Sequence, residues 1–369
     1  MKEKFIRHHG GNIWRFRKVI DFSANINPEG LSPNVVAAIK DNLNLLVHYP
    51  DPECTELTQI FCKKNNLDPG YCLWGNGAAE LFYLLFKYLK PGTIHLPIPS
   101  FCEYEGAALA ADAEIRFWSF AKENNWDIDW LEIIAEANPG DLLVITNPNN
   151  PTGFLWEKQR LLPVIDRAYS KNVNVLIDEA FIDFVDEPEK SSFIQDFYQW
   201  PNLFISYSLT KFYAIPGLRL GILLANKEMI SSLKFHKDPW NVNLLAQVAG
   251  AAALQDSAYE AISRKLAKKR REAMIELIED YLVPAGVNFW LPQANYVLLE
   301  LPVPVSDVEQ KIRDAGFLIR NCQNFRGLNE YYCRVAIRTE AENRALILTM
   351  QEIITEVKKS AESLTGKTW

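Results

Sequence analysis

Three short apolar runs in the middle of the chain have the pattern of buried strands, and each ends in polar residues: 142–146, 173–177 and 202–207. Between them, 157–171 is helix-like and 189–200 is helix-like but more irregular. Such alternation is typical of βαβ units that build a parallel sheet. Ligands bind beyond the carboxyl ends of the strands in these sheets. We therefore expect Asn150, Asp178 and Lys211 to converge on one crevice.

The same pattern divides the chain into three parts. The first, 1–42, contains an extended stretch and then a helix that begins at Ser32 and Pro33. The βα alternation indicates a large domain over 43–241. The rest, 242–369, is predicted to be a small α+β domain, against which the N-terminal part packs at the cleft. Its expected elements are a helical stretch over 242–282, β-like runs over 294–301, 317–321 and 332–337, and a helix over 340–363.

Composition narrows the class of protein. The chain has 369 residues, of which 48% are hydrophobic and 23% charged, which is ordinary for a globular protein. A net charge of -7 does not indicate a nucleic-acid-binding protein. The basic cluster 265–271 is interpreted as a solvated helix face. With neither a signal peptide nor an apolar run of membrane-spanning length, we expect a cytoplasmic protein without a membrane partner. The six cysteines form no Cys-x-x-Cys pair, so free thiols and no metal site are expected.

Lys211 is the residue that suggests chemistry. A primary amine at the end of a buried strand can lose its proton and attack a carbonyl, as in the Schiff base of pyridoxal phosphate enzymes. Most lysines after a strand are simply solvated, so the neighbouring residues must support this interpretation.

A phosphate site is predicted where a glycine-containing turn opens the apolar helix 81–89. Small residues there expose backbone N–H groups at a helix N-terminus, where the dipole favours an anion: Gly77, Ala78 and Ala79. Ser208 and Arg219 can add hydrogen bonds to the same phosphate. The alternative for Arg219 is a surface ion pair.

Three further residues suit a pyridine ring. Asp178, at a strand end, needs a cationic partner, which is either a protonated ring nitrogen or a protein cation. Asn150 can donate to a phenolic oxygen, although its Asn-Pro run could be only a turn. Phe101 can stack on the ring, and its alternative is ordinary core packing.

Taken together, these motifs resemble the fold-type I pyridoxal phosphate enzymes of the aspartate aminotransferase superfamily. The matching motifs, in order, are Asn-Pro-Thr-Gly at 150–153, Asp178-x-Ala180, and Ser208-x-x-Lys211 followed by Arg219. The resemblance implies an α/β fold, with a mostly parallel central sheet flanked by helices in the large domain and a small α+β C-terminal domain. It also implies pyridoxal 5'-phosphate as the cofactor.

The resemblance assigns a role to each matching position. Lys211 forms the Schiff base, Asp178 pairs with the pyridine nitrogen and Asn150 bonds the ring oxygen. Phe101 and Ala180 would contact the two ring faces, and Arg334 would bind the substrate carboxylate. Tyr49 matches a tyrosine that reaches the cofactor phosphate of the neighbouring subunit, so a homodimer with shared active sites is implied.

Within this superfamily the chain is similar to the histidinol-phosphate aminotransferases and, more closely, to the threonine-phosphate decarboxylases of cobamide (vitamin B12) biosynthesis. The segments that favour the second group are 9–12, 21–28, 208–219 and 319–322. The implied reaction converts L-threonine O-3-phosphate to (R)-1-aminopropan-2-yl phosphate. The alternatives are phosphoserine decarboxylation to ethanolamine phosphate, transamination of histidinol phosphate, and a catalytically silent cofactor-binding module.

A phosphorylated amino acid requires cations for its two anionic groups. Arg320 and Arg334 lie on neighbouring β-like runs, so one would bind the phosphate and the other the carboxylate. Arg338 is a weaker third candidate that depends on an unbroken strand. His9 and Asn25 are expected to line the cleft, with a surface role as the alternative for His9, and His8 is given no role.

Phe181 departs from the aminotransferase pattern. The aminotransferases usually carry at this position a tyrosine that hydrogen-bonds the ring oxygen. A phenylalanine offers no hydroxyl, and we expect the pKa of the lysine Schiff base to rise as a result.

Overall fold

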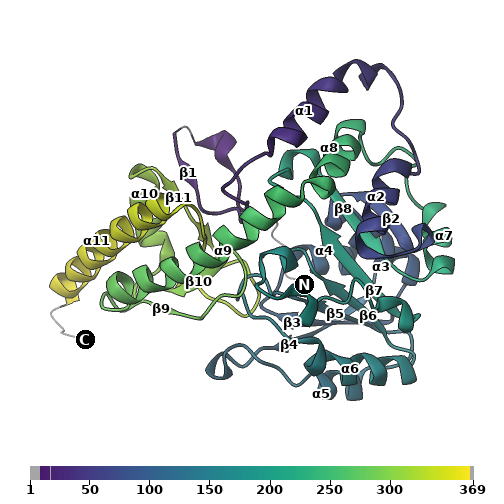
Figure 1. Ribbon diagram of the computed structural model, residues 1–369. Helices are drawn as coiled ribbons and strands as arrows, with labels where there is room; N and C mark the ends of the chain where they lie inside the picture. The colour runs from purple at the N-terminus through teal and green to yellow at the C-terminus, as the bar shows by residue number, and fades with distance from the viewer. Residues whose placement is uncertain (1–8, 17, 366–369) are drawn as a thin grey trace.

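A seven-stranded sheet forms the centre of the computed structural model, which describes residues 9–16 and 18–365 (Figure 1). His8 lies outside these residues. The strand order is β2-β8-β7-β6-β5-β3-β4, and only β8 runs antiparallel to its neighbours in this sheet. The strands are β2 (Cys72–Asn76), β3 (Thr93–Ile98), β4 (Glu114–Ser119), β5 (Leu142–Thr146), β6 (Asn174–Asp178), β7 (Leu203–Ser208) and β8 (Leu220–Leu224).

Both faces of this sheet are covered by helices because its strands carry apolar residues on both sides. Leu143 and Ile145 of β5 share one core cluster with α2, α5, α6 and α8, whereas Leu142 and Val144 share another with α3, α4 and α7. The helices are α2 (Thr55–Asn65), α3 (Ala78–Leu89), α4 (Cys102–Ala110), α5 (Trp130–Glu136), α6 (Lys158–Ser170), α7 (Lys227–Lys234) and α8 (Leu244–Gln255). The expectation of an α/β fold with a mostly parallel sheet is confirmed.

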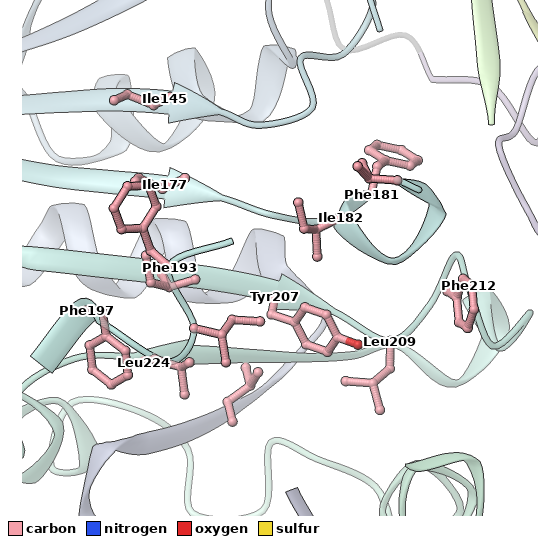
Figure 2. Close-up of a cluster of buried hydrophobic side chains, with 14 of the residues drawn as sticks. Ile145, Ile177, Phe181, Ile182, Phe193, Phe197, Tyr207, Leu209, Phe212 and Leu224 are labelled. Atoms are coloured by element: carbon pink, nitrogen blue, oxygen red, sulfur yellow. The ribbon is translucent and has the colours of Figure 1, made fainter. Parts of the chain in front are cut away.

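The first cluster extends past the strand ends towards the loops that carry the predicted site. In Figure 2, Ile145 and Ile177 lie on strands, Phe181 and Ile182 lie beyond them, and Phe212 lies in the loop after β7. Each of these five side chains is at most 5% exposed. The loops at the carboxyl edge of the sheet are therefore packed on the core, which favours a rigid site.

A second, smaller sheet lies beside the large one. Its order is β12-β13-β10-β9, all antiparallel, and a separate parallel pair joins β1 to β11. Figure 1 shows α9 running from the large part of the molecule to this small part, with α10 and α11 packed there. The elements are β1 (Ile20–Asp21), α9 (Ser257–Leu277), β9 (Asn288–Phe289), β10 (Tyr296–Glu300), α10 (Val305–Asp314), β11 (Phe317–Leu318), β12 (Arg320–Asn321), β13 (Tyr332–Ala336) and α11 (Glu340–Thr365).

The predicted helix after 32 is present as α1 (Pro33–Asp41), where the Ser32 side chain accepts a hydrogen bond from the backbone N–H of Val35. The helical stretch over 242–282 is divided, because Asp256 ends α8 and caps α9 through the N–H of Tyr259. α8 packs against α1 and α2 in the core of the large sheet. The chain thus crosses to the small part along α9.

The expectation of a helix over 189–200 is wrong. Two short 3₁₀ turns stand there, Pro188–Lys190 and Phe197–Gln199. The buried Glu179 carboxylate accepts hydrogen bonds from Ser192 Oγ and from the backbone N–H of Phe193. Hydrogen bonds to this side chain therefore take the place of helical backbone hydrogen bonds.

One glycine determines how closely the sheet approaches the start of α3. A Cβ added to Gly221 of β8 would lie 2.6 Å from the backbone nitrogen of Ala78. We predict that Gly221→Ala lowers the free energy of unfolding by about 1–3 kcal/mol, because backbone atoms cannot yield as a flexible side chain can. Urea unfolding followed by circular dichroism measures the change. Gly217→Ala is the matched control, since an added Cβ meets nothing within 4 Å there; equal effects at both positions would contradict the prediction.

Candidate active site

A cavity of about 400 Å³ lies where the carboxyl ends of β5, β6 and β7 meet the small part. It is lined by His9, Gly10, Ser23, Ala24, Asn25, Gly77, Ala78, Ala79, Phe82, Phe101, Cys102, Glu103, Tyr104, Thr146, Asn150, Asp178, Ala180, Phe181, Ser208, Thr210, Lys211, Arg219, Arg320, Phe325 and Arg334. Asn150, Asp178 and Lys211 therefore converge on one crevice, as the strand pattern predicts.

Lys211 follows β7 and is fixed by its backbone, whose carbonyl accepts a hydrogen bond from the N–H of Asn27 at 3.0 Å. Burial, together with the positive charges of Arg334 and Arg219, lowers the pKa of its amine to about 8. A substantial fraction of this amine is therefore neutral near pH 8. A neutral amine is the form that can attack a carbonyl or accept a proton.

Asp178 ends β6, and its Oδ2 accepts a hydrogen bond of 2.5 Å from the Tyr104 hydroxyl. Its Oδ1 is buried and has no hydrogen-bond partner among the described residues. Burial raises the pKa of this carboxyl to about 6, while the Tyr104 hydrogen bond opposes the rise. A buried carboxylate oxygen without a partner suits a cationic ring nitrogen, so the site fits the pyridine ring of the expected cofactor.

The orientation of Asn150 is set from the other side of the cavity. Arg334 Nη1 donates a hydrogen bond to Asn150 Oδ1, so the amide NH₂ is left to donate elsewhere. Asn150 is 8% exposed and lines the cavity. This arrangement is consistent with donation to a ring oxygen.

The turn before α3 lies next to Arg219. Gly77 has φ +79°, and a Cβ there would collide with the Arg219 guanidinium. Glycine is therefore favoured by the backbone conformation, and any other side chain would also displace the guanidinium. Ser208 Oγ and Thr210 Oγ1 lie 2.7 Å apart and line the same cavity. The structure thus gathers backbone N–H groups, a guanidinium and two hydroxyls, which together can hold a phosphate.

Three apolar side chains shape the ring site. Phe101 and Ala180 both line the cavity, so each can contact one face of a bound ring. Phe181 is 5% exposed and packs edge-to-face on Tyr296, with 4.9 Å between ring centroids. A phenylalanine at this position therefore has a packing partner in place of a hydrogen bond.

Arg320 and Arg334 lie directly opposite each other on the adjacent strands β12 and β13. Both are buried and line the cavity. Burial lowers the pKa of both guanidinium groups, that of Arg334 to about 10, and Arg320 adds to the lowering at Arg334. Two guanidinium groups thus lie in register at one wall of the cavity, where each can bind an anionic group.

The N-terminal segment completes the cavity wall. His9 Nε2 lies 2.9 Å from Glu103 Oε1, and its side chain remains 44% exposed. These two residues and Cys102 bring a nitrogen, an oxygen and a sulfur within 4.8 Å of one another. Asn25 is 1% exposed, and neither amide atom of its side chain has a partner among the described residues. Asn25 thus has free hydrogen-bonding capacity toward a ligand.

Two predicted residues lie away from the cavity. Arg338 is not brought into it, because β13 ends at Ala336 and the guanidinium bonds Glu342 and the Asp21 carbonyl instead. That candidate is therefore wrong for this cavity. Tyr49 is 77% exposed and stacks on Trp240, with 4.5 Å between ring centroids.

Sequence reasoning missed Tyr104, Thr210 and Phe325. Tyr104 lies in the first turn of α4, three residues after Phe101 at the N-cap, and the two ring centroids are 5.7 Å apart. That spacing was a usable signal. Thr210 stands beside Lys211 in the motif itself, but Phe325 lies in a loop whose position the pattern does not specify.

No helix among the described residues is long and apolar enough to span a membrane.

A family model described as aminotransferase class I and II matches residues 17–349. Threonine-phosphate decarboxylase of Salmonella typhimurium is 36% identical over 364 residues, covering 95% of this chain and 97% of that protein.

Two solved structures have the same fold. Histidinol-phosphate aminotransferase from Clostridium acetobutylicum is 30% identical with a TM-score of 0.84, covering 91% of this chain and 99% of that one. L-threonine-O-3-phosphate decarboxylase from Porphyromonas gingivalis is 27% identical with a TM-score of 0.79, covering 90% and 98%. The chain belongs to the aminotransferase class I and II family, which depends on pyridoxal 5'-phosphate.

Proposed function

We propose that the protein decarboxylates an O-phospho-amino acid, namely L-threonine O-3-phosphate, to (R)-1-aminopropan-2-yl phosphate, the linker amine of cobamides. The observation that carries this proposal is the pair Arg320 and Arg334, buried and opposite each other in the cavity. The substrate has two anionic groups, a carboxylate and a phosphate, and each arginine would bind one. The Salmonella relative with the same reaction in its name supports the choice.

The cofactor would be held by the residues that surround the ring and phosphate positions. Asp178 Oδ1 would pair with the ring nitrogen, the Asn150 amide would donate to the ring oxygen, and Phe101 and Ala180 would contact the faces. Gly77, Ala78, Ala79, Ser208 and Arg219 would hold the phosphate. When bound, the cofactor supplies an electron-withdrawing ring that stabilises negative charge at Cα of the substrate.

The side chains of the cavity would decide which bond of the substrate breaks. Arg320 and Arg334 would bind the phosphate and the carboxylate of the substrate. With both ends of the substrate bound, rotation about its Cα bonds would be restricted. Asn25 and His9 also line the cavity and can add hydrogen bonds to the substrate. Decarboxylation requires the carboxylate to be turned out of the ring plane, and transamination requires the Cα hydrogen in that position. Lys211 Nζ, with its lowered pKa, would return a proton to Cα.

A homodimer is the assembly that we propose. Tyr49 follows the 3₁₀ turn Leu43–Val47, in which Leu43, Leu46 and Val47 are exposed. An exposed apolar stretch of this kind is typical of an interface with another copy. Tyr49 would then reach the cofactor phosphate of the partner.

The proposed reaction predicts release of carbon dioxide without a keto acid. Holoenzyme is incubated with phosphothreonine and, in parallel, with phosphoserine, and carbon dioxide and the phosphorylated amine are measured. We expect turnover of phosphothreonine to exceed that of phosphoserine by about 10–200-fold, since the two differ by one methyl group. Lys211→Ala is the inactive control. Turnover of histidinol phosphate that requires 2-oxoglutarate, with no carbon dioxide release, would establish the aminotransferase instead.

Tyr104 is predicted to control the pH range of cofactor binding. Asp178 must be ionised to pair with a protonated ring nitrogen, so affinity should fall as the pH falls through the pKa of about 6. Tyr104→Phe removes a stabilising donor and should move this midpoint upward by about 1–2 pH units, from a loss of about 1.5–3 kcal/mol. Tryptophan fluorescence of the apoprotein reports the dissociation constant of pyridoxal phosphate between pH 5 and 8. Tyr88→Phe is the control, and an unchanged midpoint in Tyr104→Phe would refute the role.

The dimer is tested by a charge in the exposed turn. Leu46→Glu should dissociate the dimer in sedimentation velocity and lower the affinity for pyridoxal phosphate. Leu131→Glu places the same charge at an exposed leucine of α5 and should change neither property. Tyr49→Phe should keep the dimer and weaken cofactor affinity about tenfold, the loss of one charge-assisted hydrogen bond. A fully active monomer would rule out shared sites.

A further inference from the structure

The loop between β12 and β13 crosses from the small part to the large part of the molecule. It begins immediately after Arg320 and Asn321, so its position and that of Arg320 are linked. A Cβ added to Gly327, near its middle, would lie 3.6 Å from Ile98 Cδ1 and 3.6 Å from the backbone nitrogen of Pro99. The loop therefore rests on the end of β3, just before Phe101.

A bidentate ion pair attaches this loop to α4. Arg326 Nε and Nη2 each donate to one carboxylate oxygen of Glu105, both at 2.7 Å. The Glu105 side chain is 10% exposed, and that of Arg326 is 33% exposed. The guanidinium also lies 4.7 Å from the ring centroid of Phe117 on β4. Paired planar groups of this kind fix orientation as well as distance.

The residues just before Arg326 hold Arg320. Arg320 Nη2 donates to Asn324 Oδ1 at 2.6 Å, and its guanidinium lies 5.0 Å from the Phe325 ring centroid. Phe325 lines the cavity with Arg320. Hence the loop contacts Arg320 on one side and is attached to α4 on the other.

We propose that the Glu105–Arg326 ion pair is a positioning clamp that fixes this loop and thereby aims Arg320 into the cavity. Neither Glu105 nor Arg326 lines the cavity, so both act through Arg320. The clamp sets affinity for the anionic group that Arg320 binds, and the identity of that group rests on the proposed function.

The test separates affinity from turnover in the holoenzyme. Glu105→Gln and Arg326→Gln are expected to raise KM for phosphothreonine roughly tenfold while kcat changes less than threefold. Arg326→Gln is the variant better tolerated by folding, because its side chain is more exposed. Glu136→Gln removes the carboxylate of a surface pair with Arg116 and should leave KM unchanged.

A double-mutant cycle shows whether the clamp acts through Arg320. Arg320→Gln alone should raise KM at least as much, and adding Glu105→Gln to it should raise KM no further. Additive effects, or an unchanged KM in both single clamp variants, overturn the proposal. If the parent enzyme fails to decarboxylate phosphothreonine, the proposed function fails, and the same cycle is measured with the phosphorylated substrate that it does turn over.

Hydrogen exchange gives a readout that does not depend on the substrate. Amides of the loop between β12 and β13 should exchange faster in Glu105→Gln than in the parent, with the rest of the chain unchanged. Unchanged exchange in the loop also overturns the clamp, because the loop is then fixed by other contacts.

Discussion

Desolvation of charge is the constraint on which the cavity depends. Four ionisable side chains are buried around one space: Lys211, Asp178, Arg320 and Arg334. Burial shifts the pKa of each in the direction that favours the neutral form. Among the described residues that line the cavity, two carboxylates, Asp178 and Glu103, stand against four cations, Lys211, Arg219, Arg320 and Arg334. The cofactor phosphate, together with the phosphate and carboxylate of the proposed substrate, would offset this excess of positive charge. The enzyme would therefore gain affinity from the same burial that prepares Lys211 for chemistry.

Hydrogen bonds from the N-terminal segment connect the two parts of this site. The Ser23 carbonyl accepts from Arg334 Nη2, and the Asn27 backbone N–H donates to the Lys211 carbonyl. A few residues of extended chain thus contact both the proposed carboxylate-binding arginine and the loop of the proposed cofactor lysine. Movement of the small sheet relative to the large one would therefore shift the backbone of Lys211 through this segment.

The sequence was most informative where local pattern and topology coincide. A buried parallel strand has an apolar run and a polar end, so the convergence of Asn150, Asp178 and Lys211 follows from strand order alone. The sequence also placed Arg320 and Arg334 on neighbouring β-like runs, but their register opposite each other came only from the structure. Contacts that depend on packing between distant segments left no local trace: Glu105 and Arg326 are unremarkable charges in the sequence. Arg338 failed for a local reason, because the strand ended two residues before it.

The order of the site residues along the chain has a consequence for synthesis on the ribosome. Gly77, Asp178, Lys211 and Arg219 all precede α9, whereas Arg320 and Arg334 follow it. The large sheet and these proposed cofactor contacts are therefore translated before the strands that carry both arginines. A nascent chain could then bind its cofactor before the two arginines proposed to bind the substrate are present.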